Sequence, residues 1–240
     1  MPFDPLTAIG MVLLESGSGQ MSPSGTCFLF RQDHVALTAA HCVPPTASRI
    51  QLAFPRQATG PAPVIRVARH PSADIAALFA EGHDVVKEGY PNFAFWDQVG
   101  NWGLGEEFMT FGYPSEGPAP DSREGPVARL FLGHYQRFFE YTATAGFRYL
   151  GGEMSIPAPG GLSGAPLFRP DAHQMVTGVV TSNLESYAVT DSTEELREDG
   201  SVYRLESRRV INYGLALMLS SVDDWLQDAV PHQKGTPRNR

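Results

Sequence analysis

The chain has few of the features that mark nucleic-acid-binding, membrane-spanning or metal-dependent proteins. Its 240 residues carry 18 Lys and Arg against 26 Asp and Glu, and a net charge of −8 argues against a nucleic-acid partner. No run is long and apolar enough to span a bilayer, so we expect no membrane partner. The seven histidines lack metal-ligand spacing such as His-Glu-Xaa-Xaa-His, and no Gly-Lys-Ser/Thr loop is present. We therefore expect no metal and no cofactor.

Cysteine is also scarce, with only Cys27 and Cys42 in the sequence. Small secreted domains commonly depend on several disulfides. The start, Met1-Pro2-Phe3-Asp4, has neither the basic flank nor the apolar run of a secretory signal. We therefore expect a cytoplasmic protein with two reduced thiols. A single Cys27–Cys42 bridge is the alternative, because the two residues can lie on paired strands.

Turn residues divide the chain into short segments, since 24 glycines and 20 prolines are spread along it. The apolar runs between them are short and rich in strand-forming residues. Such spacing is typical of an antiparallel sandwich or barrel. We predict strands in residues 9–14, 27–30, 34–37, 64–67, 75–79, 108–111, 127–132, 138–142, 175–180 and 212–219.

The remaining segments are predicted as one helix, three connections and a tail. Residues 221–226 have the pattern of a helix with Ser221 as N-cap and acidic residues in its first turn. Residues 81–105 and 113–126 have few strand signals and are predicted as connections. The polar, acidic segment 184–209 is interpreted as a solvated loop, and a site for a regulatory protein partner is the alternative. The tail, 231–240, is predicted to be disordered.

A first candidate for chemistry is His41, within Leu37-Thr38-Ala39-Ala40-His41-Cys42. A strand-like run ends there in small residues, which let the backbone pass close behind a packed imidazole. An imidazole held in one orientation can act as a general base. A histidine after a strand is, by itself, more often structural.

A second candidate is Ser163, within Pro159-Gly160-Gly161-Leu162-Ser163-Gly164-Ala165-Pro166. Glycines around the serine permit a tight turn that exposes its hydroxyl and directs backbone N–H groups at a developing oxyanion. A glycine-rich hairpin with an incidental serine has the same pattern.

A third candidate is Asp74, at the start of the apolar run Ile75-Ala76-Ala77-Leu78. A buried carboxylate needs a hydrogen-bonding partner, and a histidine N–H is a suitable one. An exposed aspartate at a strand start is the ordinary alternative.

The three candidates occur in the order His, Asp, Ser, which is the chain order of the chymotrypsin triad. The blocks Thr-Ala-Ala-His-Cys, Asp-Ile-Ala-Ala-Leu and Gly-Leu-Ser-Gly-Ala-Pro resemble the signature blocks of trypsin-like serine peptidases. The resemblance implies an all-β fold of two antiparallel six-stranded β-barrels with a C-terminal helix. The first barrel would occupy residues 1–95, and the second barrel with the helix would occupy residues 96–230. His41, Asp74 and Ser163 would be catalytic, and the amides of Gly161 and Ser163 would form the oxyanion hole.

The same resemblance implies where a protein or peptide substrate would bind. Its pocket would lie between a segment with Pro157 and Ala158 and a strand with Thr181, Ser182 and Asn183. Thr181 stands where the family usually has a serine near the triad aspartate, and Asn183 replaces a glycine that keeps the pocket open. Pro157 replaces the aspartate with which trypsins bind Arg or Lys, although Glu153 is a candidate substitute.

These departures favour small or medium apolar residues before the scissile bond. Leu162 stands where zymogen-activated members have an aspartate, so we do not expect activation by N-terminal cleavage. The sequence thus predicts a serine endopeptidase. A catalytically silent, trypsin-fold binding module is the alternative. A lipase-like hydrolase is disfavoured, because its histidine would follow the serine.

Overall fold

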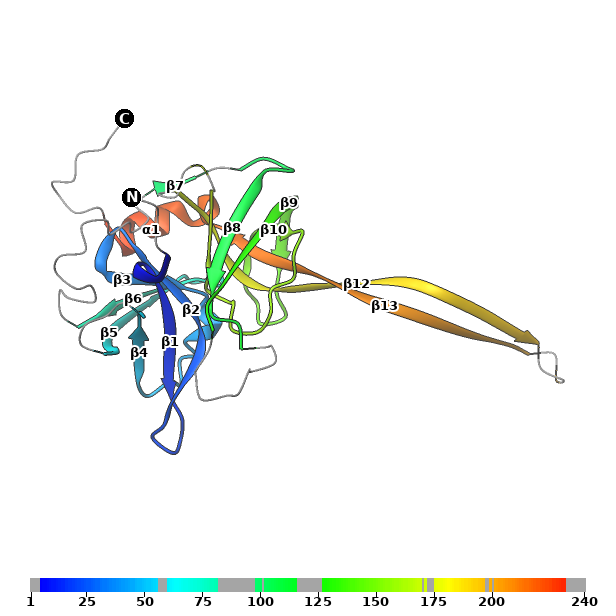
Figure 1. Ribbon diagram of the computed structural model, residues 1–240, viewed down its shortest axis with the longest axis horizontal. Helices are drawn as coiled ribbons and strands as arrows, with labels where there is room; N and C mark the ends of the chain where they lie inside the picture. The colour runs from blue at the N-terminus through cyan, green and yellow to red at the C-terminus, as the bar shows by residue number, and fades with distance from the viewer. Residues whose placement is uncertain are drawn as a thin grey trace.

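Two β-sheets lie side by side, and a long two-stranded ribbon projects from one of them (Figure 1). The computed structural model describes residues 5–55, 60–81, 98–100, 102–115, 127–169, 171, 175–196, 199 and 201–231. Within these residues no helix has the length and apolar character that crossing a membrane requires.

The first sheet is a closed barrel with the strand order β1-β2-β3-β6-β5-β4. Its strands are β1 (Ile9–Glu15), β2 (Met21–Phe30), β3 (Gln32–Thr38), β4 (Ile50–Ala53), β5 (Ala62–Arg69) and β6 (Ala76–Ala80). Side chains that point inward from four different strands form its core, among them Val12, Leu29, Leu52 and Leu78. Closure removes exposed strand edges from this half of the molecule.

The second sheet has the order β11-β8-β9-β10-β13-β12-β7, and a further pairing of β11 with β12 closes six of its strands into a ring. Its strands are β7 (Gln98–Val99), β8 (Glu107–Gly112), β9 (Arg129–Thr142), β10 (Arg148–Met154), β11 (Pro166–Phe168), β12 (Met175–Leu196) and β13 (Val202–Met218). The prediction of an all-β protein with two antiparallel six-stranded sheets is confirmed; β7 is an addition that pairs with β12 in parallel.

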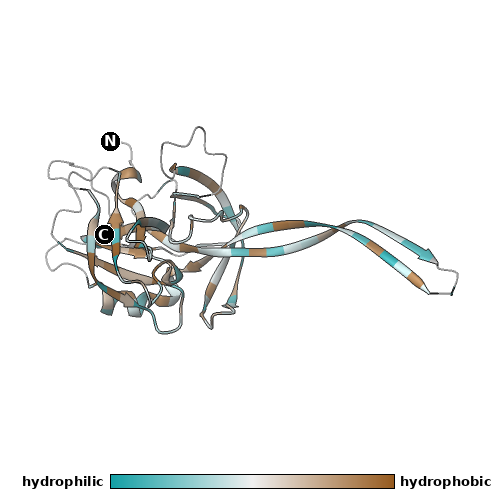
Figure 2. Ribbon diagram, turned by 90° about the horizontal axis from the view of Figure 1, so that it is seen from below, coloured by the Kyte–Doolittle hydropathy of each residue, from teal (hydrophilic) through white to brown (hydrophobic). Residues whose placement is uncertain are grey.

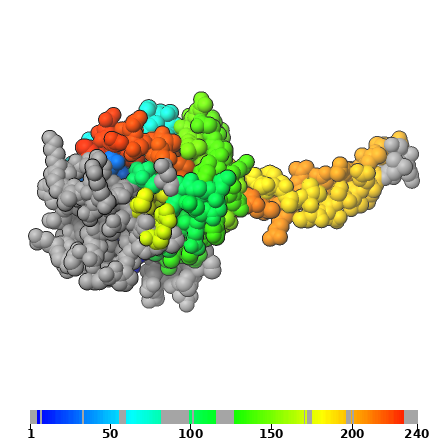
Figure 3. Space-filling view, turned by 90° about the horizontal axis from the view of Figure 1, so that it is seen from above, coloured from blue at the N-terminus to red at the C-terminus, as the bar shows by residue number. Residues whose placement is uncertain are grey.

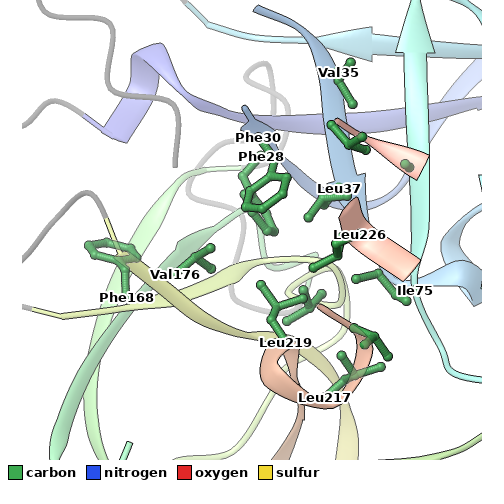
Figure 4. Close-up of a cluster of buried hydrophobic side chains, with 14 of the residues drawn as sticks. Phe28, Phe30, Val35, Leu37, Ile75, Phe168, Val176, Leu217, Leu219 and Leu226 are labelled. Carbon is green, nitrogen blue, oxygen red and sulfur yellow. The ribbon is translucent and has the colours of Figure 1, made fainter. Parts of the chain in front are cut away.

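The two sheets share one apolar core, which Figure 4 shows. Phe28 and Leu37 of the first barrel belong to the same buried cluster as Phe168 and Leu217 of the second sheet. Because this cluster excludes water from both sheets at once, the halves stabilise each other. The predicted boundary between residues 95 and 96 lies outside the described residues, as does the predicted disorder of the tail beyond Pro231.

The C-terminal helix was predicted, but its start is different. A short 3-10 turn, η3 (Leu219–Val222), precedes α1 (Asp223–Ala229). Ser221 lies in that turn and donates to the Met218 carbonyl at 2.7 Å, so the prediction that it caps the helix was wrong. A polar residue before acidic ones is the usual N-cap pattern, yet here the extra turn moves the N-cap to Val222.

A buried arginine of the first barrel attaches this helix. Arg31 donates from Nη1 to the carbonyls of Leu226 at 3.0 Å and Val230 at 2.8 Å. Both carbonyls belong to the helix C-terminus, where a cation is favourable. The C-terminal end of α1 is therefore attached to the first barrel.

The described residues of the acidic segment 184–209 lie mostly in two paired strands, so the prediction of a solvated loop was wrong. β12 and β13 continue to pair from Gly178 opposite Met218 to Leu196 opposite Val202, and form an extended ribbon. Figure 2 shows hydrophobic and hydrophilic residues interspersed along both strands of this ribbon. The overall polarity of the segment concealed this strand pattern.

Candidate active site

His41 is held at two points by a buried carboxylate. It lies in a short 3-10 turn, η2 (Ala40–Cys42), directly after β3. Its Nδ1 is 2.7 Å from Oδ2 of Asp74, and its backbone N–H donates to Oδ1 of Asp74 at 3.0 Å. Asp74 is only 6 % exposed and lies just before β6, which pairs with β3. The contact at Nδ1 fixes the ring and directs Nε2 away from the carboxylate.

The environment of His41 acts on its pKa in two directions. Burial lowers the pKa, whereas the hydrogen bond to Asp74, the neighbouring Cys42 and the charge of Asp74 raise it. The raising contributions prevail and bring the pKa from 6.5 to about 10. The carboxylate therefore strongly favours the imidazolium, which is the form that His41 takes after accepting a proton.

Ser163 lies on a tight turn whose shape depends on two glycines. Gly161 and Gly164 have φ angles of +86° and +88°, in the left-handed region that L side chains disfavour. A Cβ on Gly164 would lie 2.0 Å from the Thr26 carbonyl oxygen, and one on Gly161 would lie 2.5 Å from that of Tyr113. Backbone from other elements thus packs against both glycines. Ser163, which lies between them, is partly buried.

The Ser163 hydroxyl points toward β12. Its Oγ donates to the carbonyl of Thr181 at 3.2 Å. Among the hydrogen bonds of the described residues, none joins Ser163 to His41. Catalytic hydrogen bonds often form only in the substrate complex, so this arrangement is compatible with a nucleophile at rest.

The first barrel supports the serine turn from behind through Thr26 of β2. The Thr26 amide donates to the Ser163 carbonyl at 2.8 Å, and its hydroxyl donates to the Gly161 carbonyl at 2.8 Å. Cys42 adds a contact from Sγ to the Ser163 carbonyl at 3.6 Å. Thr26 is a positioning residue that the sequence does not reveal, because a threonine in a strand is an ordinary strand former.

The two cysteines are both buried and unbridged. Burial and the neighbouring Cys42 raise the pKa of the Cys27 thiol well above its usual range. Cys27 is consequently a poor source of thiolate.

The peptide plane before Gly161 is turned in a defined direction. The Gly160 carbonyl accepts a hydrogen bond from the Ser115 amide at 2.7 Å. In a trans peptide the following N–H points the opposite way, so the Gly161 amide faces away from Ser115. Within the described part of the chain, neither this amide nor that of Ser163 has a hydrogen-bond acceptor. That these two amides form the oxyanion hole stays a prediction.

Asn183 joins the two segments predicted to flank the substrate pocket. Its Oδ1 accepts from the Ala158 amide at 2.7 Å, and its Nδ2 donates to the Ala158 carbonyl at 2.7 Å. Ala158 is buried, whereas the neighbouring Pro157 is exposed. The asparagine side chain therefore crosses from the strand with Thr181 and Ser182 to the segment with Ala158.

Two other residues named from the sequence have different partners. The Thr181 hydroxyl donates to the Leu215 carbonyl at 3.1 Å and accepts from Tyr149 at 3.0 Å, so these partners, rather than Asp74, occupy it. Glu153 accepts from Arg137 of β9 at 2.6 Å. The Glu153 carboxylate is thus already neutralised by a neighbouring strand. The described residues contain no group of three or more His, Cys, Asp or Glu suited to hold a metal ion.

Comparisons with known proteins agree with the fold. Residues 25–179 match the profile of a trypsin-like peptidase domain. The fold is similar to the active form of the Rv3671c protease from M. tuberculosis, with 15% identity, a TM-score of 0.62, and coverage of 97% of this chain and 85% of that one. It is also similar to the MamO protease domain from Magnetospirillum magneticum, with 14% identity, a TM-score of 0.61, and coverage of 93% and 98%.

A third similar structure is the HtrA-type protease AlgW with a decapeptide. The identity is 14%, the TM-score is 0.60, and the match covers 95% of this chain and 65% of that one. No curated protein sequence matches the chain.

Proposed function

Because the chain belongs to the trypsin-like peptidase family, we propose that it is a serine endopeptidase that hydrolyses peptide bonds through an acyl-enzyme. The observation that carries the proposal is the two-point attachment of His41 to Asp74, at 2.7 and 3.0 Å. Buried Asp74 gives one carboxylate oxygen to the His41 ring and the other to the His41 backbone, so the carboxylate holds the imidazole in one orientation. This pair fixes the base, and the turn from Gly161 to Gly164 exposes the serine.

The proposed reaction begins with rotation of the Ser163 hydroxyl from the Thr181 carbonyl to Nε2 of His41. His41 then takes the hydroxyl proton while Oγ attacks the scissile carbonyl. The amides of Gly161 and Ser163 bind the oxyanion, and His41 returns the proton to the leaving amine. Water, activated in the same way, hydrolyses the acyl-enzyme. The rotation also frees the Thr181 carbonyl to accept an N–H of the substrate.

The proposed specificity is for small or medium apolar residues before the scissile bond. The bridge from Asn183 to Ala158 closes the space that a large side chain would need. Glu153 is paired with Arg137, so it does not supply the counter-charge for a substrate Arg or Lys. A cation buried there without a partner is strongly unfavourable.

A silent protein-binding module is the second candidate. The hydrogen bond from Ser163 to Thr181 and the Asn183 bridge favour it, since together they occupy both the nucleophile and the pocket. In this alternative the same residues would be structural.

Labelling with a fluorophosphonate separates the two candidates. We expect stoichiometric modification of Ser163 in the wild-type protein and none in Ser163→Ala. Peptide turnover should fall by roughly 10⁶-fold in Ser163→Ala or His41→Ala, and by less in Asp74→Asn. Ser16→Ala is the matched control, because Ser16 is an exposed serine in a surface turn. A wild-type protein that neither labels nor cleaves would support the silent module.

A further inference from the structure

The ribbon formed by residues 184–196 of β12 and 202–213 of β13, here called the arm, has no third strand. β12 contacts β11 and β7 only through residues 175–179, and β13 contacts β10 only through residues 214–217. Both edges of the arm are therefore unpaired among the described residues. Figures 1 and 3 show the arm projecting from the rest of the protein. An isolated two-stranded ribbon is marginally stable in water, so an added strand would stabilise it.

Large apolar side chains on the arm are exposed. Near its base Tyr187, Val189 and Val210 are 56%, 54% and 50% exposed. Farther out, Leu205 is 57% exposed. Tyr187 lies opposite Val210, and Val189 follows on the same face of the ribbon, so these three side chains form one exposed apolar group. Such a group marks an interaction surface.

The free edge of β12 is a direct continuation of the candidate active site. The Thr181 carbonyl faces the Ser163 hydroxyl and hence points away from β13. The register of β12 shifts at Thr181 and again between Val189 and Asp191, and between these two points every second residue presents its N–H and C=O to the same side. Gly214, opposite Asn183, donates its N–H to Ile156 and not to β12, so Asn183 is one of the outward-facing residues. Asn183, Glu185, Tyr187 and Val189 therefore present their backbone groups to the edge on which a substrate would lie.

The charge of the arm differs between its two strands. β12 has Glu185, Asp191, Glu194 and Glu195 and no basic residue between residues 181 and 196. The basic residues are on β13, where Arg204 and Arg208 form ion pairs with Glu206 at 3.2 and 2.8 Å, and Arg204 also lies 3.7 Å from Glu194 of β12. A strand added beside β12 would thus face an acidic neighbour. Opposite charges on adjacent strands stabilise a pair, and like charges destabilise it.

We propose that the β12 edge of the arm is an extended substrate-binding site. It adds, as a third antiparallel strand, the part of a polypeptide that lies N-terminal to the scissile bond. The chemistry of the arm selects an extended segment in which Lys or Arg alternates with apolar residues. The proposal rests on the proposed peptidase function, because that function places the scissile bond at Ser163. Main-chain pairing supplies affinity, and the side chains supply selectivity.

The test compares three peptides with the same cleavage sequence. One ends about four residues before the scissile bond, one carries an extension of about twelve residues with alternating Lys and Val, and one has Glu in place of Lys. We expect the Lys-containing peptide to exceed the short one by roughly 10- to 100-fold in kcat/KM, and the Glu-containing peptide to show no such gain.

Two variants locate the effect on the arm. In the first, residues 188–209 are replaced by Asn-Gly, which joins the paired residues Tyr187 and Val210 through a tight hairpin turn. It should cleave all three peptides at the rate of the short one. In the second, Asp191→Lys with Glu195→Lys, two exposed acidic residues are reversed, and the preference should move to the Glu-containing peptide.

Binding of the fluorescent peptides to Ser163→Ala, measured by anisotropy, repeats the comparison without catalysis. If the wild-type protein cleaves none of the peptides, the proposed peptidase function is refuted, and the binding measurement still tests the proposed role of the arm. An unchanged preference after shortening of the arm would overturn the proposal. The proposal would also be overturned if shortening of the arm converted an oligomer to a monomer without affecting peptide binding, since the arm would then join copies of this chain.

Discussion

Replacement of Gly164 by alanine should destabilise the protein and displace the serine turn. The φ angle of +88° costs a residue with a Cβ about 1–2 kcal/mol. The new methyl group would also lie 2.0 Å from the Thr26 carbonyl oxygen and 2.3 Å from the Thr38 hydroxyl, so the turn and β2 must separate. Such overpacking costs about 1–3 kcal/mol. The two contributions together lower the free energy of unfolding by about 2–5 kcal/mol and Tm by on the order of 10 °C.

Gly146→Ala is the matched control for this substitution. Gly146 has a φ of +86°, yet no atom lies within 4 Å of its hypothetical Cβ. It should show the backbone cost alone, about 1–2 kcal/mol. Thermal unfolding of both variants, with fluorophosphonate labelling rates, tests the difference. Equal losses of stability with unchanged labelling of Gly164→Ala would refute the close packing of the serine turn against Thr26.

Three further predictions concern the base, the pocket and the helix. Asp74 raises the pKa of His41 above 6.5, and only neutral His41 accepts a proton, so activity should rise with pH above 7. Titration of the His41 ring by NMR should give a lower pKa in Asp74→Asn than in the wild-type protein, and an unchanged pKa would contradict this. Asn183→Gly removes the bridge to the Ala158 segment. The ratio of kcat/KM for substrates with an aromatic residue before the scissile bond to kcat/KM for those with alanine should rise by roughly 10-fold or more. An unaltered ratio would show that the bridge does not limit the size of the pocket. Arg31→Met removes the buried hydrogen bonds to the C-terminus of α1. The free energy of unfolding, measured by urea titration, should fall by about 2–3 kcal/mol. A loss below about 0.5 kcal/mol would show that other contacts hold the helix.

Strands with a continuous apolar run were predictable from the sequence, and those without one were not. The run 75–79 coincides with most of β6, which is buried at every position. β10 contains Arg148, two glycines and Glu153, and it has no apolar periodicity because Gly151 and Gly152 make room for neighbouring side chains such as Tyr141 and Tyr135. Only the packed sheet explains why glycines are suitable there.

In the candidate site, too, local sequence patterns were predictable and long-range contacts were not. Blocks around His41, Asp74 and Ser163 were recognisable because each joins a functional residue to small neighbours within a few positions. Long-range partners left no local pattern. Thr26 reaches Gly161 across 135 positions, and nothing in its own strand marks it. The arm was missed for another reason: Glu194 and Arg204, which form an ion pair between β12 and β13, look like residues of a solvated loop when each strand is considered alone.

The contacts of Thr26 determine when the serine turn can form during synthesis of the chain. The serine turn is completed by a strand made much earlier in the chain, through hydrogen bonds of 2.8 Å to both Gly161 and Ser163. The N-terminal barrel contains every strand needed for its own closure and can form first as the chain emerges. The turn of Ser163, the proposed nucleophile, in contrast takes its shape only when residues beyond Ser163 have been made and the second sheet has docked. A nascent chain would therefore have no working nucleophile while its own unfolded segments were still exposed to cleavage.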